Sequence, residues 1–473
     1  MENHVRRIET KGATFALNNE STNPAQEGGF RPDAPVATFV PEQDFIAEKL
    51  MREPPKPREP KKPGRRRPRR SIWSHLGRLI VVLAILFGMY LTAVFSDIPF
   101  IAKWRTIYIQ TAMATMRHQW LATYFIPGFV IDEALSELEQ SRQMQIGVNS
   151  TWSNRDAQNS GDKILTRNPT LKNTAGMKPE QIDFYNDFWE IDVDTMEKYV
   201  REHPDVVKKG WDKININEAG LDDDGTSIRT HMGEKVLAVN APERILIVRE
   251  QGTNYRGVLA ICKDPSRVSM QYASTLGIVG QRCGEIAQAH NGIIGVTASG
   301  FLDDGGVGSG AEPVGFCMCN GEPYGWHMPS GYKRLELHED DRMYICDSQD
   351  PVDPSTTDCV EFSPAMIVDG VSVLEGNGWG WSDLQPRASI GQSENGEVLF
   401  LLIEGRRPGI SIGLSVGECA ELLVPHKCMQ ALNVDGGTTA MIWYDGAYIM
   451  ESSNPVMTQG RQLPNAFVYE RAH

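Results

Sequence analysis

Hydrophobic and polar positions follow three patterns along the chain. Residues 1–70 contain no long apolar run, and their last part, "REPPKPREPKKPGRRRP", is dense in proline and charge. One uninterrupted apolar stretch, "LIVVLAILFGMYLTAVF" at 79–95, follows. Beyond residue 231, short apolar runs alternate with clusters of Gly, Asp, Asn and Pro. These patterns predict a solvated tail without a fold, a membrane-spanning helix and a β-rich domain.

The apolar stretch is long enough to cross a membrane once. No charged residue lies between Arg78 and Asp97. At about 1.5 Å per residue the stretch covers roughly 27 Å of the ~30 Å hydrocarbon core, and the "IPFIA" segment just beyond extends it. A buried core helix is the alternative, but such helices rarely lack a polar face over this length. We predict a transmembrane helix within residues 71–101.

The charge of the chain changes sign across this stretch. Residues 1–78 carry 16 Lys and Arg against 10 Asp and Glu, whereas residues 97–473 carry 31 against 51. Basic residues beside a span stay on the cytoplasmic side, which places the N-terminus inside and residues 102–473 outside the cell membrane. The 78 residues before the apolar run exceed the short leader of a cleaved signal peptide, so we expect an uncleaved signal anchor.

The basic tail raises the question of nucleic acid. Ten Lys and Arg fall between Arg52 and Arg70. The tail has no interleaved aromatic residues, is cut by prolines and adjoins the span, so orientation of the span and attraction to anionic lipid explain the charge better. We expect residues 1–70 to be a disordered cytoplasmic tail and expect no nucleic acid partner.

Two further regions precede the β-rich domain. The segment "KWRTIYIQTAMATMRHQWLATY" at 103–124 lacks Pro and Gly and predicts one amphipathic helix, ended by Pro127, in a juxtamembrane region 102–135. Residues 136–230 are polar and predict a linker or small accessory region. Their "DDDG" at 222–225 lacks the alternating acids of an EF-hand, so a solvated turn is expected there.

Strands dominate residues 231–473. We expect them at "KVLAVN", "RILIVRE", "GVLAICK", "GIIGVTASGF", "PVGFCMCNGE", "EVLFLLIEG", "CMQALNV" and "TAMIWYDGAYIM". Helices are expected at 267–278 and at 415–426, where Glu418 lies three residues after Ser415, as in a capping box. The fold class is therefore α+β, with a mixed β-sheet in one domain.

All eight cysteines lie beyond the span, which limits their chemistry. An even number of cysteines on the exported side predicts at least one disulfide. Zinc is the competing use, because Cys317, Cys319 and His327 are close in sequence. Their C-x-C spacing departs from that of ordinary zinc knuckles, so we expect no zinc site.

The most polar strand end is "VDGGTT" at 434–439, which carries Asp435. Glycines there can bring backbone N–H groups to an anion, although Asp-Gly is also a common hairpin turn. Arg387 and Arg406 lie beside other predicted strands, and the arginine fork suits phosphate. Either arginine could instead be a surface ion pair. Glu404, just before Arg406, is a second candidate acid.

The order of these pieces resembles the phosphodiester glycosidase family. The resemblance rests on five blocks over about 85 residues: "PRASIG", "LLIEGR", "GLSVGECAELL", "ALNVDGGTTAMI" and "GRQLPNAFVY". A weaker match lies upstream in "TASGFLDDGGVGSG", where Gly300 and Phe301 fit the family pattern. Thr297 stands where the family has Asn, and Glu404 stands where it has Asp.

The resemblance implies hydrolysis of the bond between a sugar anomeric carbon and a phosphate. Such a reaction needs a carboxylate and stabilisation of charge on the sugar and on the departing phosphate. We assign Asp435 as the principal carboxylate and Glu404 as the second, with Arg387 and Arg406 holding phosphate. The other expected site residues are Asn433, Gly436, Gly437, Thr438, Thr439, Arg461, Thr297, Gly300 and Phe301.

The predicted protein is a membrane-anchored, extracytoplasmic hydrolase of a sugar-1-phosphodiester in an envelope polysaccharide or glycan. No cofactor is expected; a structural calcium ion at Asp303, Asp304 or Asp350 is left open. One alternative is a non-catalytic envelope protein that binds phosphodiester-containing polysaccharide through the same arginines. A second is a membrane-anchored scaffold whose tail recruits cytoplasmic partners.

Overall fold

A computed structural model describes residues 72–115, 118–152, 167–221, 223–303, 307–374 and 381–472. The chain divides into two units, Met1–His75 and Leu76–His473. The predicted tail, residues 1–70, lies outside the described residues. Apart from the first residues of α1, every element below belongs to the second unit.

The predicted transmembrane segment is the helix α1 (Ile72–Phe95). Residues His75–Phe95 form one helix that is long and apolar enough to cross a membrane. A core helix of a soluble protein would be covered by other elements, yet only 6% of the apolar window in α1 is buried. Length, composition and exposure agree with a span or a signal sequence.

Three short helices follow α1: α2 (Pro99–Met113), α3 (Trp120–Thr123) and α4 (Gly128–Met144). The prediction of one helix over 103–124 is therefore wrong. The Gln119 side chain donates a hydrogen bond of 3.2 Å to the Met113 carbonyl oxygen, which takes the place of a helical backbone bond where α2 ends. Gly128 also begins a helix, α4, directly after Pro127.

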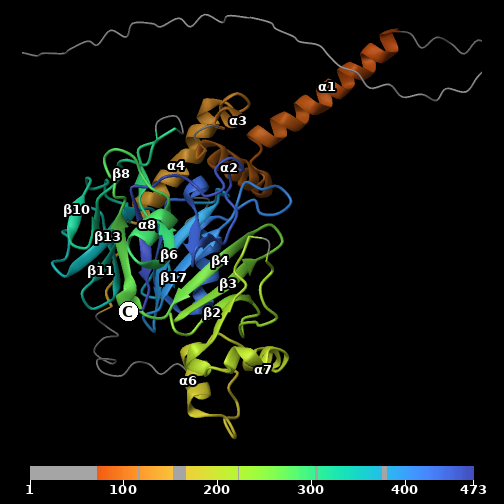
Figure 1. The fold of residues 1–473 in the computed structure, drawn as a ribbon. Coiled ribbons are helices and arrows are strands. Elements are labelled where there is room, and N and C mark those ends of the chain that lie inside the picture. The colour runs from red at the N-terminus through yellow and green to blue at the C-terminus, as the bar shows by residue number, and fades with distance from the viewer. Residues whose placement is uncertain are drawn as a thin grey trace, which may run out of the picture. The chain divides into compact units, whose positions relative to one another are not determined.

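An antiparallel sheet of nine strands forms the centre of the fold (Figure 1). Every neighbouring pair in it is antiparallel. In spatial order the strands are β1 (Asn215–Asn217), β2 (Lys235–Asn240), β3 (Ile245–Gln251), β4 (Arg256–Cys262), β17 (Val398–Ile403), β16 (Arg387–Ser393), β18 (Cys428–Val434), β14 (Ala365–Val368) and β15 (Val371–Ser372).

A five-stranded sheet packs against one face of the central sheet. Phe400 on β17 and Phe467 on β21 meet across the interface, with ring centroids 6.1 Å apart, inside a shared apolar core. In spatial order this sheet contains β20 (Ala447–Tyr448), β19 (Ile442–Tyr444), β6 (Gly292–Thr297), β21 (Asn465–Glu470) and β5 (Val268–Tyr272). The helix α8 (Cys283–Ala289), which the sequence pattern did not predict, packs on this sheet, where Gly284 touches the Trp443 ring.

Helices cover the other face of the central sheet. They are α6 (Pro179–Asp187), α7 (Val193–Glu202) and α9 (Val416–Leu423), with short 3-10 turns η2 (Pro204–Val207), η3 (Trp211–Lys213) and η6 (Val424–His426). Leu399 and Leu401 on β17 pack into this second core, while Phe400 and Leu402 face the first. Both faces of β17 are thus buried, which explains its continuous apolar run.

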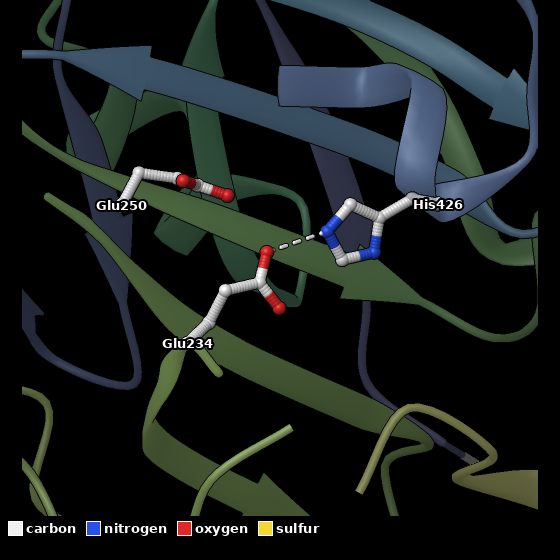
Figure 2. Close-up of side chains that lie close together, drawn as sticks. All are labelled: Glu234, Glu250 and His426. Atoms are coloured by element: carbon white, nitrogen blue, oxygen red, sulfur yellow. Dashed lines mark hydrogen bonds and ion pairs between the residues drawn. The ribbon is translucent and has the colours of Figure 1, made fainter. Parts of the chain in front are cut away.

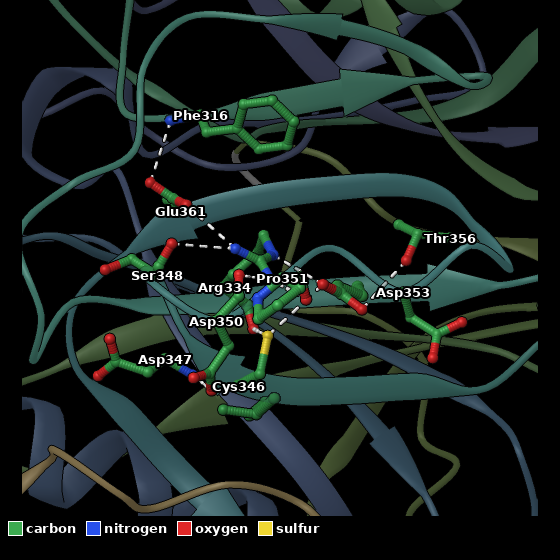
Figure 3. A network of polar contacts seen from close by, with 12 residues as sticks. Phe316, Arg334, Cys346, Asp347, Ser348, Asp350, Pro351, Asp353, Thr356 and Glu361 are labelled. Carbon is green, nitrogen blue, oxygen red and sulfur yellow. Dashed lines mark hydrogen bonds and ion pairs between the residues drawn. The ribbon is translucent and has the colours of Figure 1, made fainter.

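A third sheet contains a buried network of charges (Figure 3). Its strands, in spatial order, are β10 (Glu322–Tyr324), β9 (Cys317–Cys319), β13 (Thr356–Phe362), β11 (Lys333–His338) and β12 (Met343–Asp347), and a separate pair is β7 (Gly300–Phe301) with β8 (Pro313–Val314). Arg334 is fully buried and lies 2.7 Å from Glu336 and 3.5 Å from Glu361. Its guanidinium also donates to the carbonyl oxygens of Ser348, Asp350 and Pro351. All its charge is therefore compensated within the sheet.

The α+β fold class is confirmed, and so is the helix that begins after Ser415. The Ser415 side chain accepts a hydrogen bond from the Glu418 backbone N–H, and the Glu418 carboxylate accepts one from the Ser415 backbone N–H, which completes the capping box. The helix expected over 267–278 is wrong, because Val268–Tyr272 is the strand β5. Pairing of β5 with β21 decides this segment, since Val268 and Met270 enter the shared core.

The expectation of at least one disulfide is also wrong. All eight cysteines are free, and seven of them are buried. Four lie on strands of the third sheet: Cys317 and Cys319 on β9, Cys346 on β12 and Cys359 on β13. Cys317 Sγ lies 3.7 Å from the Tyr324 carbonyl oxygen. Burial raises the pKa of Cys283 to about 12 and that of Cys317 to about 11, so these thiols stay protonated at neutral pH.

Candidate functional site

Strand ends from two sheets meet at the predicted site. In the central sheet, Arg387 at the start of β16 pairs with Ile403 at the end of β17, and Ala388 pairs with Val434 at the end of β18. The backbone N–H of Asp435 then donates to Ala298, just after β6 of the second sheet, at 3.3 Å. The segments after β6, β17 and β18 are therefore neighbours, as the sequence prediction requires.

The 435–439 segment is not a hairpin turn. It contains the 3-10 turn η7 (Gly437–Thr439) and connects β18 in the central sheet to β19 in the second sheet. Gly437 has φ +69° and donates its N–H to the Pro386 carbonyl oxygen at 2.9 Å. A side chain on Gly436 would lie 2.6 Å from that same oxygen. Close contact with Pro386 therefore requires both glycines.

Asp435 is half-buried at the start of this segment. Burial raises the pKa of its carboxyl to about 7, and the neighbouring charge of Asp303 acts in the same direction. A hydrogen bond with Thr439 and the charge of Arg461 oppose the increase. Near neutral pH the carboxyl can therefore exchange a proton, which is the property required of a general acid or base.

The charge of Arg461 acts on Asp435, and Arg461 also contacts the segment after β6. Its guanidinium forms an ion pair with both carboxylate oxygens of Asp303 and donates to the Gly308 carbonyl oxygen at 2.9 Å. The same guanidinium lies 4.5 Å from the centre of the Phe301 ring. Arg461 and Phe301, both predicted site residues, are thus in contact with each other.

Arg406 lies beside Gly437 of the 435–439 segment. Its guanidinium donates two hydrogen bonds to Gln385 Oε1, of 3.1 and 2.6 Å. A side chain on Gly437 would be only 3.4 Å from the two Nη atoms of Arg406. The residue as a whole is exposed. Arg406 therefore brings a partly buried positive charge next to the segment that carries Asp435.

Arg387 is placed more deeply. It is 9% exposed, its Nη2 lies 2.9 Å from Asp383 Oδ1, and its Nε donates to the Leu414 carbonyl oxygen at 3.0 Å. Its charge nevertheless acts on Arg406, whose pKa is lowered by partial burial of the guanidinium and then by Arg387. Arg387 thus contributes to the field of the site while its own side chain is held by Asp383.

Residues 290–470 match the model of the family described as phosphodiester glycosidase. This segment belongs to the phosphodiester glycosidase family. The match runs from the residues just before β6 to the end of β21, and it contains every predicted site residue. The resemblance drawn from five sequence blocks is confirmed.

Solved structures resemble the chain at low sequence identity. The catalytic domain of zebrafish N-acetylglucosamine-1-phosphodiester α-N-acetylglucosaminidase, auto-inhibited by its pro-peptide, is 14% identical over 48% of this chain and 82% of its own, with a TM-score of 0.40. A hypothetical protein from Synechocystis is 14% identical over 51% and 64%, with a TM-score of 0.36. A protein of Burkholderia pseudomallei named as exported is 13% identical over 46% and 74%, with a TM-score of 0.35. No curated protein sequence matches the chain.

Glu404, the predicted second carboxylate of the glycosidase domain, is completely buried. Its Oε2 lies 2.6 Å from Arg407, and its Oε1 accepts the Glu451 N–H at 3.0 Å and lies 3.9 Å from Arg256. Asp303 is the acid whose charge acts on Asp435. Asp303 was expected from the sequence only as a possible calcium ligand and was not among the predicted site residues. The catalytic role of Glu404 stays a prediction.

The polar side chains of the other predicted site residues are mostly buried or already hydrogen-bonded. Asn433 is buried and donates its amide to the Ser363 carbonyl oxygen at 2.9 Å, away from solvent. Thr438 shares a hydrogen bond of 3.1 Å with Ser453, and Thr439 donates to the Gly436 carbonyl oxygen. Thr297 is fully buried and its hydroxyl has no hydrogen-bond partner among the described residues. Gly300 pairs with Val314 in the small β7–β8 sheet.

One group of metal-binding side chains gathers in the described part of the chain, outside the predicted site residues. Donor atoms of Glu234, Glu250 and His426 all lie within 4.8 Å of one another (Figure 2). Glu234 and His426 already share a hydrogen bond of 2.8 Å, while burial raises the pKa of Glu250 to about 9. Two carboxylates and an imidazole suit a divalent ion. A protonated Glu250 is neutral, however, so the group does not need a metal ion to balance its charge.

Within the part of the chain that the structure describes, the other candidate metal ligands from the sequence do not form such a group. His327 Nδ1 lies 2.7 Å from Glu361, and its ring stacks on Phe316, so it is engaged away from Cys319. Asp303 is paired with Arg461, and Asp350 accepts a hydrogen bond from Asn149 at 2.9 Å. Asp304 lies outside the described residues.

Proposed function

We propose that the chain hydrolyses a sugar-1-phosphodiester and that Asp435 is the carboxylate that activates water. Water adds to the anomeric carbon, and the bond between that carbon and the phosphate oxygen breaks. The products are the free sugar and a phosphomonoester. The observation that carries the proposal is the position of Asp435, with a pKa of about 7, beside the partly buried guanidinium of Arg406 and the Asp303–Arg461 pair.

Asp435 acts as the base in this mechanism. A carboxylate with a pKa near neutral pH accepts the proton of the attacking water while enough of it remains ionised. A positive charge accumulates on the sugar in the transition state, and the ionised Asp435 stabilises it. Phosphate is already a fair leaving group, so the departing oxygen needs charge stabilisation more than a strong acid.

Arg406 provides that stabilisation. Gln385 holds its Nε and Nη2, which fixes the guanidinium beside Gly437 while the residue remains exposed. The N–H of Gly437 is already donated to Pro386, so the phosphate is bound by a side chain more than by the backbone. An arginine held in place loses little entropy when it binds a phosphate oxygen.

The proposed enzyme is anchored by α1 with its N-terminus in the cytoplasm. The helix His75–Phe95 has the length and composition of a span, and the basic residues of 61–78 lie just before its apolar core. Residues 102–473 are then extracytoplasmic, which places the site next to envelope glycans.

Replacement of Asp435 by Asn tests the function. The full chain in lipid nanodiscs is given methyl esters of sugar 1-phosphates, starting with N-acetylglucosamine, which the name of the zebrafish protein suggests. We expect release of sugar by the natural chain and at least about a hundredfold lower kcat for Asp435→Asn, the usual scale for loss of a general base. Asp445→Asn is the matched control, because Asp445 lies at the opposite end of β19, paired with Arg471.

Three outcomes have distinct meanings. Loss of activity in Asp435→Asn with an unchanged Tm supports the assignment, and full activity in that variant discards it. Binding of the esters without release of sugar by the natural chain would establish the non-catalytic alternative.

A further inference from the structure

A cavity of about 330 Å³ lies between α2 and the segments that precede β16 and follow β17. Ile107 and Tyr108 of α2 form one wall, and Leu384, Pro408 and Ile412 form the opposite wall. These side chains are predominantly apolar. A cavity of this size accommodates a short stretch of alkyl or isoprenoid chain, and its walls offer such a chain dispersion contacts in place of water.

The cavity and the proposed phosphate site share one residue. Arg406 lines the cavity, and the same side chain lies beside Gly437. The charge of Asp435 also acts on Arg406. A ligand whose phosphate binds Arg406 therefore has the Asp435 segment on one side and an apolar cavity on another. Such a ligand needs a sugar on one phosphate ester and an apolar group on the other.

The helix α2 is fixed to the domain at this place. Thr111 accepts the Leu384 N–H through its hydroxyl at 3.1 Å and the Gln385 side-chain amide through its carbonyl oxygen at 3.1 Å. Gln110 accepts a hydrogen bond of 2.9 Å from the Ser382 hydroxyl. Because Gln385 also holds Arg406, the wall formed by α2 and the arginine are parts of one hydrogen-bonded structure.

Three residues separate the same helix from the apolar helix α1. Arg105 of α2 donates hydrogen bonds of 3.0 Å to the carbonyl oxygens of Val94 and Ser96 at the end of α1. Trp104, Tyr108 and Ile412 around the cavity are at least 39% exposed. If α1 crosses a membrane, the cavity therefore opens close to that membrane, where apolar chains are available.

We propose that this cavity binds the hydrocarbon chain of the substrate, which is a sugar 1-phosphate esterified to a long apolar alcohol. The inference rests on the proposed function and names its substrate class. Water adds to the anomeric carbon, the bond from that carbon to the phosphate oxygen breaks, and one proton passes to solvent. The sugar is released, and the lipid phosphate monoester stays in the membrane. A soluble polysaccharide phosphodiester would place a second polar sugar against these apolar walls.

Chain length tests the proposal without a change of sugar. The full chain in lipid nanodiscs is compared on the methyl and octyl esters of the same sugar 1-phosphate, across hexoses and N-acetylhexosamines. Each buried methylene contributes about a fourfold factor to affinity. We expect at least about a tenfold lower KM for the octyl ester with kcat little changed, since the chain lies away from the reacting carbon.

Two variants test whether binding in this cavity causes the lower KM of the octyl ester. Ile107→Glu on α2 and Ile412→Glu on the opposite wall each place a charge in the cavity, and we expect both to abolish the preference for octyl while the methyl ester is still hydrolysed. Val371→Glu is the control, because Val371 is an apolar residue, 63% exposed, on β15 and outside the cavity. Because the two variants lie on different walls of the cavity, the test remains valid if one of them fails to fold.

The outcomes separate this inference from the proposed function. Equal KM values for the two esters, or an octyl preference that survives in both cavity variants, overturn the lipid substrate and leave the hydrolase standing. Failure to hydrolyse either ester of any sugar removes both proposals.

Discussion

Gln385 Oε1 accepts two hydrogen bonds from the guanidinium of Arg406, of 3.1 and 2.6 Å. The amide of the same Gln385 donates to the Thr111 carbonyl oxygen on α2 at 3.1 Å. One neutral side chain thus orients the proposed phosphate-binding arginine and joins it to the helix that follows the apolar segment. A neutral partner leaves the charge of Arg406 free for the substrate, which a carboxylate would not.

Replacement of Gln385 by Leu should weaken substrate binding more than it slows the chemical step. Arg406 loses both hydrogen bonds, so it must be ordered when phosphate binds, and we expect KM for the methyl ester to rise about tenfold. Ser382→Ala is the matched control, since it removes a contact with α2 but none with Arg406. Steady-state kinetics separate the two effects. An equal rise of KM in both variants would mean that docking of α2, and not the orientation of Arg406, is what matters.

The activity should depend on the ionisation of Asp435. Its pKa is raised to about 7, and the base form is the ionised one, so kcat/KM should fall about tenfold per pH unit below that value. The charge of Asp303 raises this pKa, so Asp303→Asn should move the midpoint to lower pH. A pH–rate profile between pH 5 and 9 checks both statements. An acidic limb that stays in place in Asp303→Asn would assign that limb to another group.

Glu250 should make the fold less stable as the pH rises. Its folded pKa, raised by burial to about 9, exceeds the value of about 4.3 expected in the unfolded chain. The folded state therefore binds more protons between these values, and stability present below about pH 4.3 is lost as the pH rises through about 9. Glu250→Gln should remove this slope, whereas Glu322→Gln on the exposed strand β10 should keep it. Tm measured across this range, with and without a chelator, is the readout.

Among the charged residues at the second core, Lys263 should be the one whose replacement lowers the free energy of unfolding most. It is buried between Glu190, at 2.6 Å, and Glu397, at 2.7 Å. Lys263→Met leaves two carboxylates buried without their cation, which should cost about 3–5 kcal/mol of unfolding free energy. Lys208→Met removes an exposed pair with Asp205 and should cost under about 1 kcal/mol. Chemical denaturation compares the two, and similar losses would contradict the importance assigned to burial.

Local sequence alone determined the elements whose signal is local. The apolar run at 79–95 has the length of a span, and the spacing of Ser415 and Glu418 fixes the start of α9. Period-two patterns and turn residues gave most strands after residue 231. The family resemblance located Asp435, because an ordered set of short blocks survives in the sequence even where each block is ambiguous.

Only the tertiary structure decided which polar groups are free. Glu404 and Asp303 both follow strand ends in the sequence, yet long-range partners bury Glu404 against Arg407 and place Asp303 beside Arg461. Val268–Tyr272 is a strand because β21, almost 200 residues later, pairs with it. Gln385 shows no motif, and its role exists because Thr111 and Arg406 meet on either side of it. Local patterns record the backbone preference and burial of each segment, but partners far apart in the chain are chosen by packing.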